Sequence, residues 1–322
     1  MIIYILKRTV TGLLLIIGIT ILTFLFIRLA PGNPLNRFYD PTKPNPEMQT
    51  LAKQWALERP LGEQLRTWIR NTLRGDLGKS FVSNRPVTEV LMQTLPNTLI
   101  LTVAALVLKI LFGSILGIIQ VAHINRRTDR WINTSALIIY GMPTFLVALF
   151  FVMVFSHILK WLPSSQMISF NYESFSWLGK IMDRITHIIL PVLSLSLLSI
   201  AATSRYVRNC LADVLSQEYI LAARARGIPT AVIFKRHAFK NVLVPTVTWV
   251  GQHLPFLVGG SVVIETIFSW PGMGRLIVIS TFARDYPVIV ACTAIIAIFV
   301  VFGNILADVI CAYIDPRIRL ES

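Results

Sequence analysis

Residues 218–241, EYILAARARGIPTAVIFKRHAFKN, form a basic segment between two strongly apolar parts of the chain. Its first half has the composition of a short helix. Gly227 can take the left-handed conformation that ends a helix, and Pro229 prevents the same helix from continuing. Thr230 can cap a second helix over residues 231–240. The segment is therefore predicted to be a helix-turn-helix with five basic side chains around a glycine corner: Arg224, Arg226, Lys235, Arg236 and Lys240.

Two interpretations of this segment compete. A basic loop between membrane helices can serve only to fix their orientation, which is a common role. Such a loop needs neither a glycine stop nor an alanine-rich first helix, and this segment has both, at Gly227 and at Ala222, Ala223 and Ala225. Small side chains let another surface approach the backbone closely, and arginines pair with carboxylates. We therefore interpret the segment as a docking element.

The composition places the chain in a membrane. Of its 322 residues, 54% are hydrophobic and only 14% are charged, which leaves too few polar groups to cover a soluble protein. The net charge of +14 is explained by basic cytoplasmic loops, so no nucleic-acid partner is expected. The five histidines and three cysteines show no metal-ligand spacing, and no metal or catalytic site is expected either.

Six apolar stretches are long enough to cross a bilayer. The first could be a cleaved signal peptide, but it is too long and is followed by Pro31-Gly32-Asn33-Pro34 rather than a cleavage site. Pro143, inside the third stretch, is expected to kink it. The chain is thus predicted to be an all-α polytopic membrane protein with six transmembrane helices, over residues 9–30, 98–121, 131–158, 187–203, 242–264 and 288–313.

The distribution of basic residues predicts the orientation. With the amino terminus inside, the cytoplasmic segments hold fourteen Lys and Arg residues, and the two short outer loops hold five. The long outer segment counts little in this rule. Both termini and residues 218–241 are therefore expected in the cytoplasm.

Residues 31–95 form the long polar outer segment. Leu61, Leu65, Trp68, Ile69 and Leu73 recur at helical spacing and predict an amphipathic helix on the membrane surface, and residues 47–57 suggest another. The sequence GDLGKS at residues 75–80 ends like a phosphate-binding loop. That motif requires a glycine at the position of Leu73, and no βαβ unit surrounds it. Nucleotide binding by this chain is not expected.

Several stretches together resemble the inner-membrane permease subunits of binding-protein-dependent ABC importers, specifically the dipeptide/oligopeptide permease B type. The matching stretches are RLAPGNP (28–34), GDLGKS (75–80), LPNTL (95–99), VLSQEYILAARARG (214–227), GGSVVIETIFSWPGMGRL (259–276), ARDYPV (283–288) and DPRIR (315–319). The resemblance implies a type I ABC importer (MetI-like) permease fold. Residues 1–95 would then hold the first transmembrane helix and the external amphipathic segment, residues 96–314 the permease core, and residues 315–322 a cytoplasmic tail.

In that family the helix-turn-helix is the coupling element that docks on an ATPase subunit. Its signature, Glu-Ala-Ala followed after three residues by Gly, falls on Leu221-Ala222-Ala223 and Gly227, so Leu221 replaces the usual Glu. The nearest acid is Glu218, which leaves the polar contacts of docking open. The resemblance implies that docking uses Glu218, Ala222, Ala223, Arg224, Arg226, Gly227 and His237.

The resemblance also implies the partners. ATP and Mg would bind two partner ATPase subunits, and this non-catalytic chain would hold no cofactor. It would pair with a second, homologous permease in a bacterial or archaeal inner membrane. An extracytoplasmic binding protein would deliver the substrate. Peptides are the default substrate, while metal chelates, glutathione and sugars remain open.

Other residues are candidates for the translocation path or outer gate. Lys109 lies within the second apolar stretch, where inserting a charge into the membrane costs about 2.5–3.5 kcal/mol. It can face a water-filled path or pair with an acid of another subunit. Alternatively, it lies away from the centre of the membrane and its side chain extends to the interface. Gly259 and Gly260 allow close approach of helices or substrate, with simple helix packing as the alternative. Glu265 begins an outer loop over residues 266–287 whose Trp270 and Met273 are expected at the gate or the binding-protein contact.

Two other function classes would each predict a distinct pattern in the sequence. An ion-coupled transporter or channel working without ATPases would predict several acids or histidines at mid-membrane depth and an inverted repeat. An intramembrane enzyme would need a catalytic or metal constellation within the spans. The sequence shows neither pattern, so an importer permease subunit is the favoured function.

Overall fold

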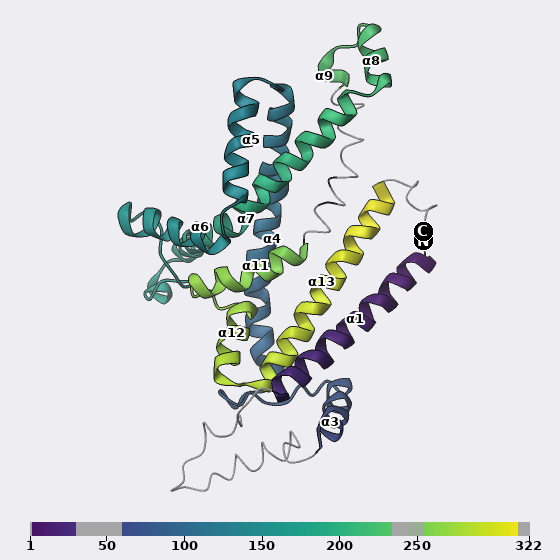
Figure 1. The fold of residues 1–322 in the computed structure, drawn as a ribbon. Helices are drawn as coiled ribbons and strands as arrows, with labels where there is room; N and C mark the ends of the chain where they lie inside the picture. The colour runs from purple at the N-terminus through teal and green to yellow at the C-terminus, as the bar shows by residue number, and fades with distance from the viewer. Residues whose placement is uncertain (1, 30–59, 234–245, 247–248, 250–253, 315–322) are drawn as a thin grey trace. The chain divides into compact units, whose positions relative to one another are not determined.

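The structure of the chain, a computed structural model, describes residues 2–29, 60–233, 246, 249 and 254–314 (Figure 1). Within these ranges every regular element is a helix, and the pairing of strand type is an isolated bridge between Lys79 and Pro86. The all-α prediction is confirmed. The chain forms two compact units: the first is built mainly from residues 99–270, and the second from residues 7–98 and 271–301.

Four helices are long and apolar enough to cross a membrane: α1 (Ile2–Leu29), α4 (Val87–Ala122), α7 (Trp177–Leu215) and α13 (Tyr286–Ile314). They correspond to four of the predicted spans. Helices α4 and α7 contain 36 and 39 residues, so both extend well beyond the apolar stretches that predicted them. Hydropathy marks the part of a helix suited to hydrocarbon, whereas backbone hydrogen bonding continues through the polar turns at either end.

The predicted span over residues 131–158 is broken. Helix α5 (Arg127–Tyr140) meets α6 (Thr144–Phe151) at an angle of 103°, and α6 continues into the wide turns of η2 (Val152–Ile158). Pro143 lies at the break, in extended backbone just before α6. Because proline lacks an N–H group and pushes the preceding residue out of the helical region, the helix stops there. Where a kink within one helix was expected, the structure thus has two separate helices that meet at a sharp bend.

The region after residue 241 differs from expectation in another way. The predicted span 242–264 lies largely outside the described residues, and α11 (Leu254–Ile267) covers its second half. The predicted membrane crossing over residues 242–264 therefore remains a prediction. A helix, α12 (Met273–Ala283), replaces the middle half of the loop expected over residues 266–287, and it ends at Arg284 in the left-handed conformation. The glycine- and proline-rich start of this segment hid the apolar helix that follows it.

The core of the first unit lies where α4, α6, α7 and α11 meet. Its buried side chains include Leu101 and Ala105 of α4, Leu190 and Leu195 of α7, and Ile264 of α11. The short elements of this unit are η3 (Tyr172–Ser174), α8 (Glu218–Ala225) and α9 (Thr230–Ile233).

Helices α4 and α7 touch at two glycines one turn apart. A Cβ atom added to Gly113 would lie 2.7 Å from the Cβ of Thr203, and one added to Gly117 would lie 2.8 Å from the carbonyl oxygen of Ser204 and from the Cβ of Val207. These separations are too short for real atoms. Because a step of four residues on α4 matches a step of four on α7, the helices run parallel along this seam. Small residues four apart are typical of close helix packing in membranes.

The second unit contains α3 (Leu61–Leu73), the predicted amphipathic helix. Leu65 and Trp68 on its inner face pack against Phe24 of α1, while Leu73 is exposed. The predicted helix is confirmed, and its position on the membrane surface stays a prediction. The second predicted amphipathic helix, over residues 47–57, lies outside the described residues.

Asp285 holds the start of α13 to the loop before α4, within the second unit. Its carboxylate accepts the hydroxyl of Ser80 at 2.5 Å and the N–H of Phe81 at 2.9 Å. The Ser80 hydroxyl oxygen in turn accepts the N–H groups of Val82 and Ser83. Burial raises the pKa of the Asp285 carboxyl, although these hydrogen bonds act in the opposite direction.

Replacing Ser80 with alanine removes this shared hydroxyl and leaves Oδ2 of the buried Asp285 carboxylate with a long bond from the N–H of Val82, at 3.4 Å. We expect Ser80→Ala to lower the stability of the purified chain by about 1–3 kcal/mol, measured as a lower midpoint of thermal unfolding in detergent. Ser83→Ala is the matched control, because Ser83 is exposed on the same loop. Equal midpoints for the two variants would contradict this role for Ser80.

Candidate functional site

The basic segment begins directly after α7. Two residues, Ser216 and Gln217, link Leu215 at the end of α7 to Glu218 at the start of α8, and Figure 1 shows α8 and α9 beyond that end of α7. The Ser216 hydroxyl donates to the carbonyl of Asp213 at 2.7 Å. Ile220 is fully buried. The start of α8 is thus fixed to the end of α7 by a short link and an apolar anchor.

The corner after α8 is set by backbone hydrogen bonds. Gly227 has a φ of +76°. Its N–H donates to the carbonyl of Arg224 at 2.9 Å, and the N–H of Ile228 donates to the carbonyl of Ala223 at 3.3 Å. This pair of bonds defines a Schellman motif, which needs a left-handed residue at the position of Gly227. The predicted glycine corner is confirmed.

The second helix of the segment is described only at its beginning. Helix α9 starts at Thr230, so Thr230 is its first residue rather than the preceding cap. The N–H groups of Val232 and Ile233 donate to the carbonyl of Pro229. Residues 234–241, among them the predicted docking residue His237, lie outside the described part of the chain.

The other predicted docking residues form an accessible surface on α8 and its corner. Ala223 is half-buried, and the rest are exposed: Glu218, Ala222, Arg224, Arg226 and Gly227. Leu221, which occupies the position of the expected acid, has 53% of its surface exposed. The surface therefore combines an apolar and alanine-rich patch with two arginines, and it offers little obstruction to a partner.

Lys109 lies on α4, one turn before Gly113. Its exposed fraction is 1%, and its Nζ atom has no hydrogen-bond partner in the described part of the chain. The same holds for the hydroxyl groups of Ser194 and Thr203 on α7 and for the side-chain amide of Gln120 on α4. Sequence analysis singled out Lys109 alone. For Ser194 and Thr203 the available signal was the series of serines and threonines along residues 194–204, and for Gln120 it was a polar residue near the end of an apolar stretch.

The predicted gate residues are buried where the structure describes them. Glu265 is fully buried on α11, and its carbonyl accepts the N–H of Trp270, which lies in the core of the first unit. Met273 is buried in the second unit, and its N–H donates to the Thr98 hydroxyl at 2.8 Å. Gly259 and Gly260 fall within α11, at positions whose packing is not described.

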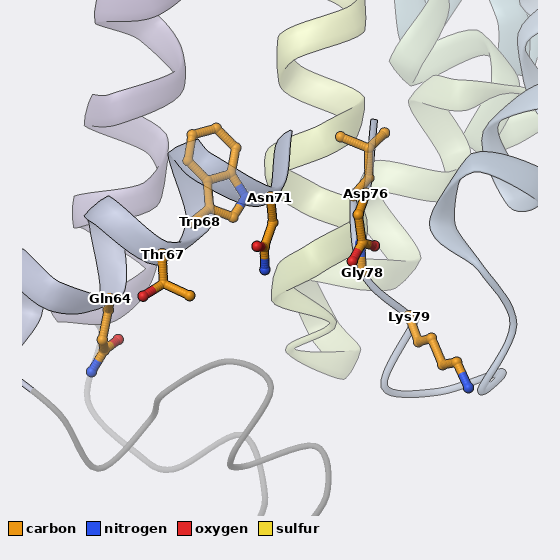
Figure 2. Close-up of a pocket in the computed structure, with 8 residues that line it drawn as sticks. Gln64, Thr67, Trp68, Asn71, Asp76, Gly78 and Lys79 are labelled. Atoms are coloured by element: carbon orange, nitrogen blue, oxygen red, sulfur yellow. The ribbon is translucent and has the colours of Figure 1, made fainter. Parts of the chain in front are cut away.

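The GDLGKS segment lines a pocket of about 220 Å³ next to α3. Figure 2 shows Trp68 and Asn71 of α3 on one side, with Asp76 and Lys79 of the following loop on the other. The loop's N–H groups are used within the chain: Gly75 and Asp76 donate to carbonyls of α3, and Gly78 donates to the Asp76 carboxylate at 2.9 Å. A phosphate-binding loop directs such groups at its ligand, whereas these three N–H groups form the turn that follows α3.

No group of three or more His, Cys, Asp or Glu side chains is placed to hold a metal ion within the described ranges. The residues singled out above thus fall into two groups: an exposed surface on α8 and its corner, and buried polar side chains on α4 and α7.

Comparison with known proteins gives two adjoining family matches. Residues 109–320 match the family described as the binding-protein-dependent transport system inner membrane component. Residues 1–102 match the amino-terminal part of the corresponding membrane component. Together the two matches cover most of the chain.

Individual relatives match over nearly their whole length. The chain is 38% identical over 317 residues to the oligopeptide transport system permease protein AppB of Bacillus subtilis, covering 98% of this chain and 99% of that protein. It is 35% identical over 318 residues to the glutathione transport system permease protein GsiC of Shigella flexneri, covering 99% of each.

A solved structure supports the fold. The chain aligns with an inward-facing structure of the MetNI methionine ABC transporter with a TM-score of 0.57 and 15% identity, covering 71% of this chain and 97% of the other. The fold resemblance implied by the sequence motifs is thus supported independently. From the family matches and the full-length relatives, the chain belongs to the inner membrane component family of binding-protein-dependent transport systems.

Proposed function

We propose that this chain is the permease subunit of an ATP-driven importer that moves peptides, or a similar small solute, delivered by an external binding protein. Near full-length similarity to an oligopeptide permease and a glutathione permease carries this proposal. Both kinds of substrate contain peptide bonds and free carboxylates. The preference for one peptide length or composition is left to the binding protein.

The chain itself is proposed to be non-catalytic. ATP and Mg would bind two separate ATPase subunits, and a second, homologous permease would complete the membrane part. The basic loops favour cytoplasmic termini and a cytoplasmic α8 in a multi-pass inner-membrane protein. On this orientation the pocket beside α3 faces the side from which the binding protein delivers substrate.

We propose that α8 and its corner dock on an ATPase subunit. Three properties support this role: the arginines are exposed, the alanines permit close approach, and the Schellman motif fixes the direction in which the chain leaves the helix. ATP binding and release would move the docking surface on the ATPase. The permease would then change between inward-facing and outward-facing states as a two-state element biased by nucleotide.

The coupling role can be tested at Gly227. Proline cannot adopt the observed positive φ and has no N–H to donate to Arg224, so Gly227→Pro must destroy the corner. We expect it to abolish uptake and binding-protein-stimulated ATP hydrolysis in the reconstituted complex, while membrane insertion persists. Gly227→Asn is the matched control, because asparagine tolerates the left-handed conformation and no atom lies within 4 Å of an added Cβ. Normal stimulated ATPase activity in the proline variant would remove the coupling role.

We further propose that the translocation path or outer gate includes Lys109, Gly259, Gly260, Glu265, Trp270 and Met273. For Lys109 the argument is physical. An ammonium group with no partner in the described part of its own chain is costly in a membrane helix. It becomes less costly if transport exposes it to water or to an acid on the second permease.

Replacement of Lys109 tests this proposal. We expect Lys109→Met to lower substrate uptake at normal expression, since methionine keeps an unbranched side chain of similar length and removes the ammonium group. Leu108→Met, at the position directly before Lys109 on α4, controls for the effect of a methionine on helix packing. Unchanged uptake by Lys109→Met would assign Lys109 to helix packing instead.

A further inference from the structure

A partly buried ion pair joins α5 to α7 in the first unit: the Asp129 side chain is 4% exposed and the Arg208 side chain 23%. Arg208 donates from Nε to Oδ1 and from Nη2 to Oδ2 of Asp129, each at 2.8 Å. The Asp129 side chain is almost fully buried, and its Oδ2 also accepts the N–H of Asn125 at 3.1 Å. The two parallel bonds fix both the distance and the relative orientation of the two side chains, which a single bond would not do.

The pair lies close to the proposed coupling element along the chain. Asp129 is in the first turn of α5, next to the connection from α4. Arg208 is seven residues before Leu215, where α7 ends, which is about 10 Å along a helix at 1.5 Å per residue. After Leu215 only the link of Ser216 and Gln217 separates α7 from α8. A displacement of α8 therefore reaches Arg208 through an unbroken helix and a short, hydrogen-bonded link.

The same part of α7 is held against α4. Val207 and Leu211 of α7 pack with Val121 of α4 in a buried apolar cluster, and Gly117 contacts Val207 directly. Helix α7 is thus held against α4 by close packing, and against α5 by packing together with the ion pair. A bidentate ion pair fixes the distance and orientation of its two side chains, so it adds a directional contact to the packing between α5 and α7.

We propose that the Asp129–Arg208 pair is a positioning contact that makes α5 follow α7 when α8 moves, and so transmits the state of the ATPase to the membrane helices. This inference rests on the proposed docking role of α8. Ion pairs, whether exposed or buried, contribute little net stability, and their best-supported use is to specify one geometry. A rigid connection between two moving helices is a use of that kind.

The test uses the complete complex with its ATPases and second permease in proteoliposomes, with the binding protein and substrate supplied. The variants are Asp129→Asn, Arg208→Gln and the double variant, with Arg208→Lys as a conservative change that keeps the charge and loses the two-pronged bond. Arg130→Gln is the matched control, because Arg130 is exposed and adjacent to Asp129. The measured quantity is substrate imported per ATP hydrolysed.

We expect each single variant to assemble and hydrolyse ATP but to import at least about fivefold less substrate per ATP, the lower end of typical coupling effects. The double variant should be no worse than either single one, because both remove the same contact. Arg208→Lys should be intermediate, and Arg130→Gln should match the wild type.

Three outcomes separate the possible failures. If the single variants keep the wild-type ratio, the pair does not transmit movement and the inference is overturned. If every variant at the pair, including Arg208→Lys, fails to assemble, the contact serves folding and the inference is equally overturned. If the wild-type complex shows no ATPase stimulation by the binding protein, the proposed function itself fails, independently of the ion pair.

Discussion

The close contact between α4 and α7 determines the arrangement of the first unit. Gly113 and Gly117 leave no room for a side chain, so the backbone of α4 lies directly against α7. Lipid does not drive helices together by the hydrophobic effect, so this packing depends on van der Waals contact over a short distance. The short distance between α4 and α7 requires glycine at residues 113 and 117, because a residue with a Cβ atom at either position would separate the helices or change their register.

The seam also explains where the polar groups of the core lie. Lys109 and Gln120 flank the two glycines on α4, and Ser194 and Thr203 lie on α7. A membrane helix tolerates such groups when a neighbouring helix covers them, but an unpaired ammonium remains costly. At the cytoplasmic end predicted by the basic loops, the Asp129–Arg208 pair satisfies its charges within the chain. The first unit thus contains a paired contact between α5 and α7 and, on α4, a lysine whose ammonium has no hydrogen-bond partner among the described residues.

Sequence reasoning succeeded where the determining signal was local. A glycine two residues before a proline predicted the corner at Gly227, because helix termination depends on a few neighbouring backbone groups. The spacing of Leu65 and Trp68 likewise predicted α3. The sequence did not predict hydrogen bonds between residues far apart in the chain. Ser80 and Asp285 are 205 residues apart, and Asp129 and Arg208 are 79 residues apart. Helix α12 was missed because Pro271 and Gly272 suggested a loop and masked the apolar run after them.

The proposal that α8 docks on a motor subunit is tested most directly by cross-linking in the assembled complex. A photoreactive amino acid in place of Ala222, on the exposed face of α8, should form an adduct with an ATPase subunit. The same group in place of Phe170, which is 94% exposed in the connection between η2 and α7, should form none. A transport-active complex in which position 222 yields no ATPase adduct, or in which position 170 yields the same one, would contradict the account.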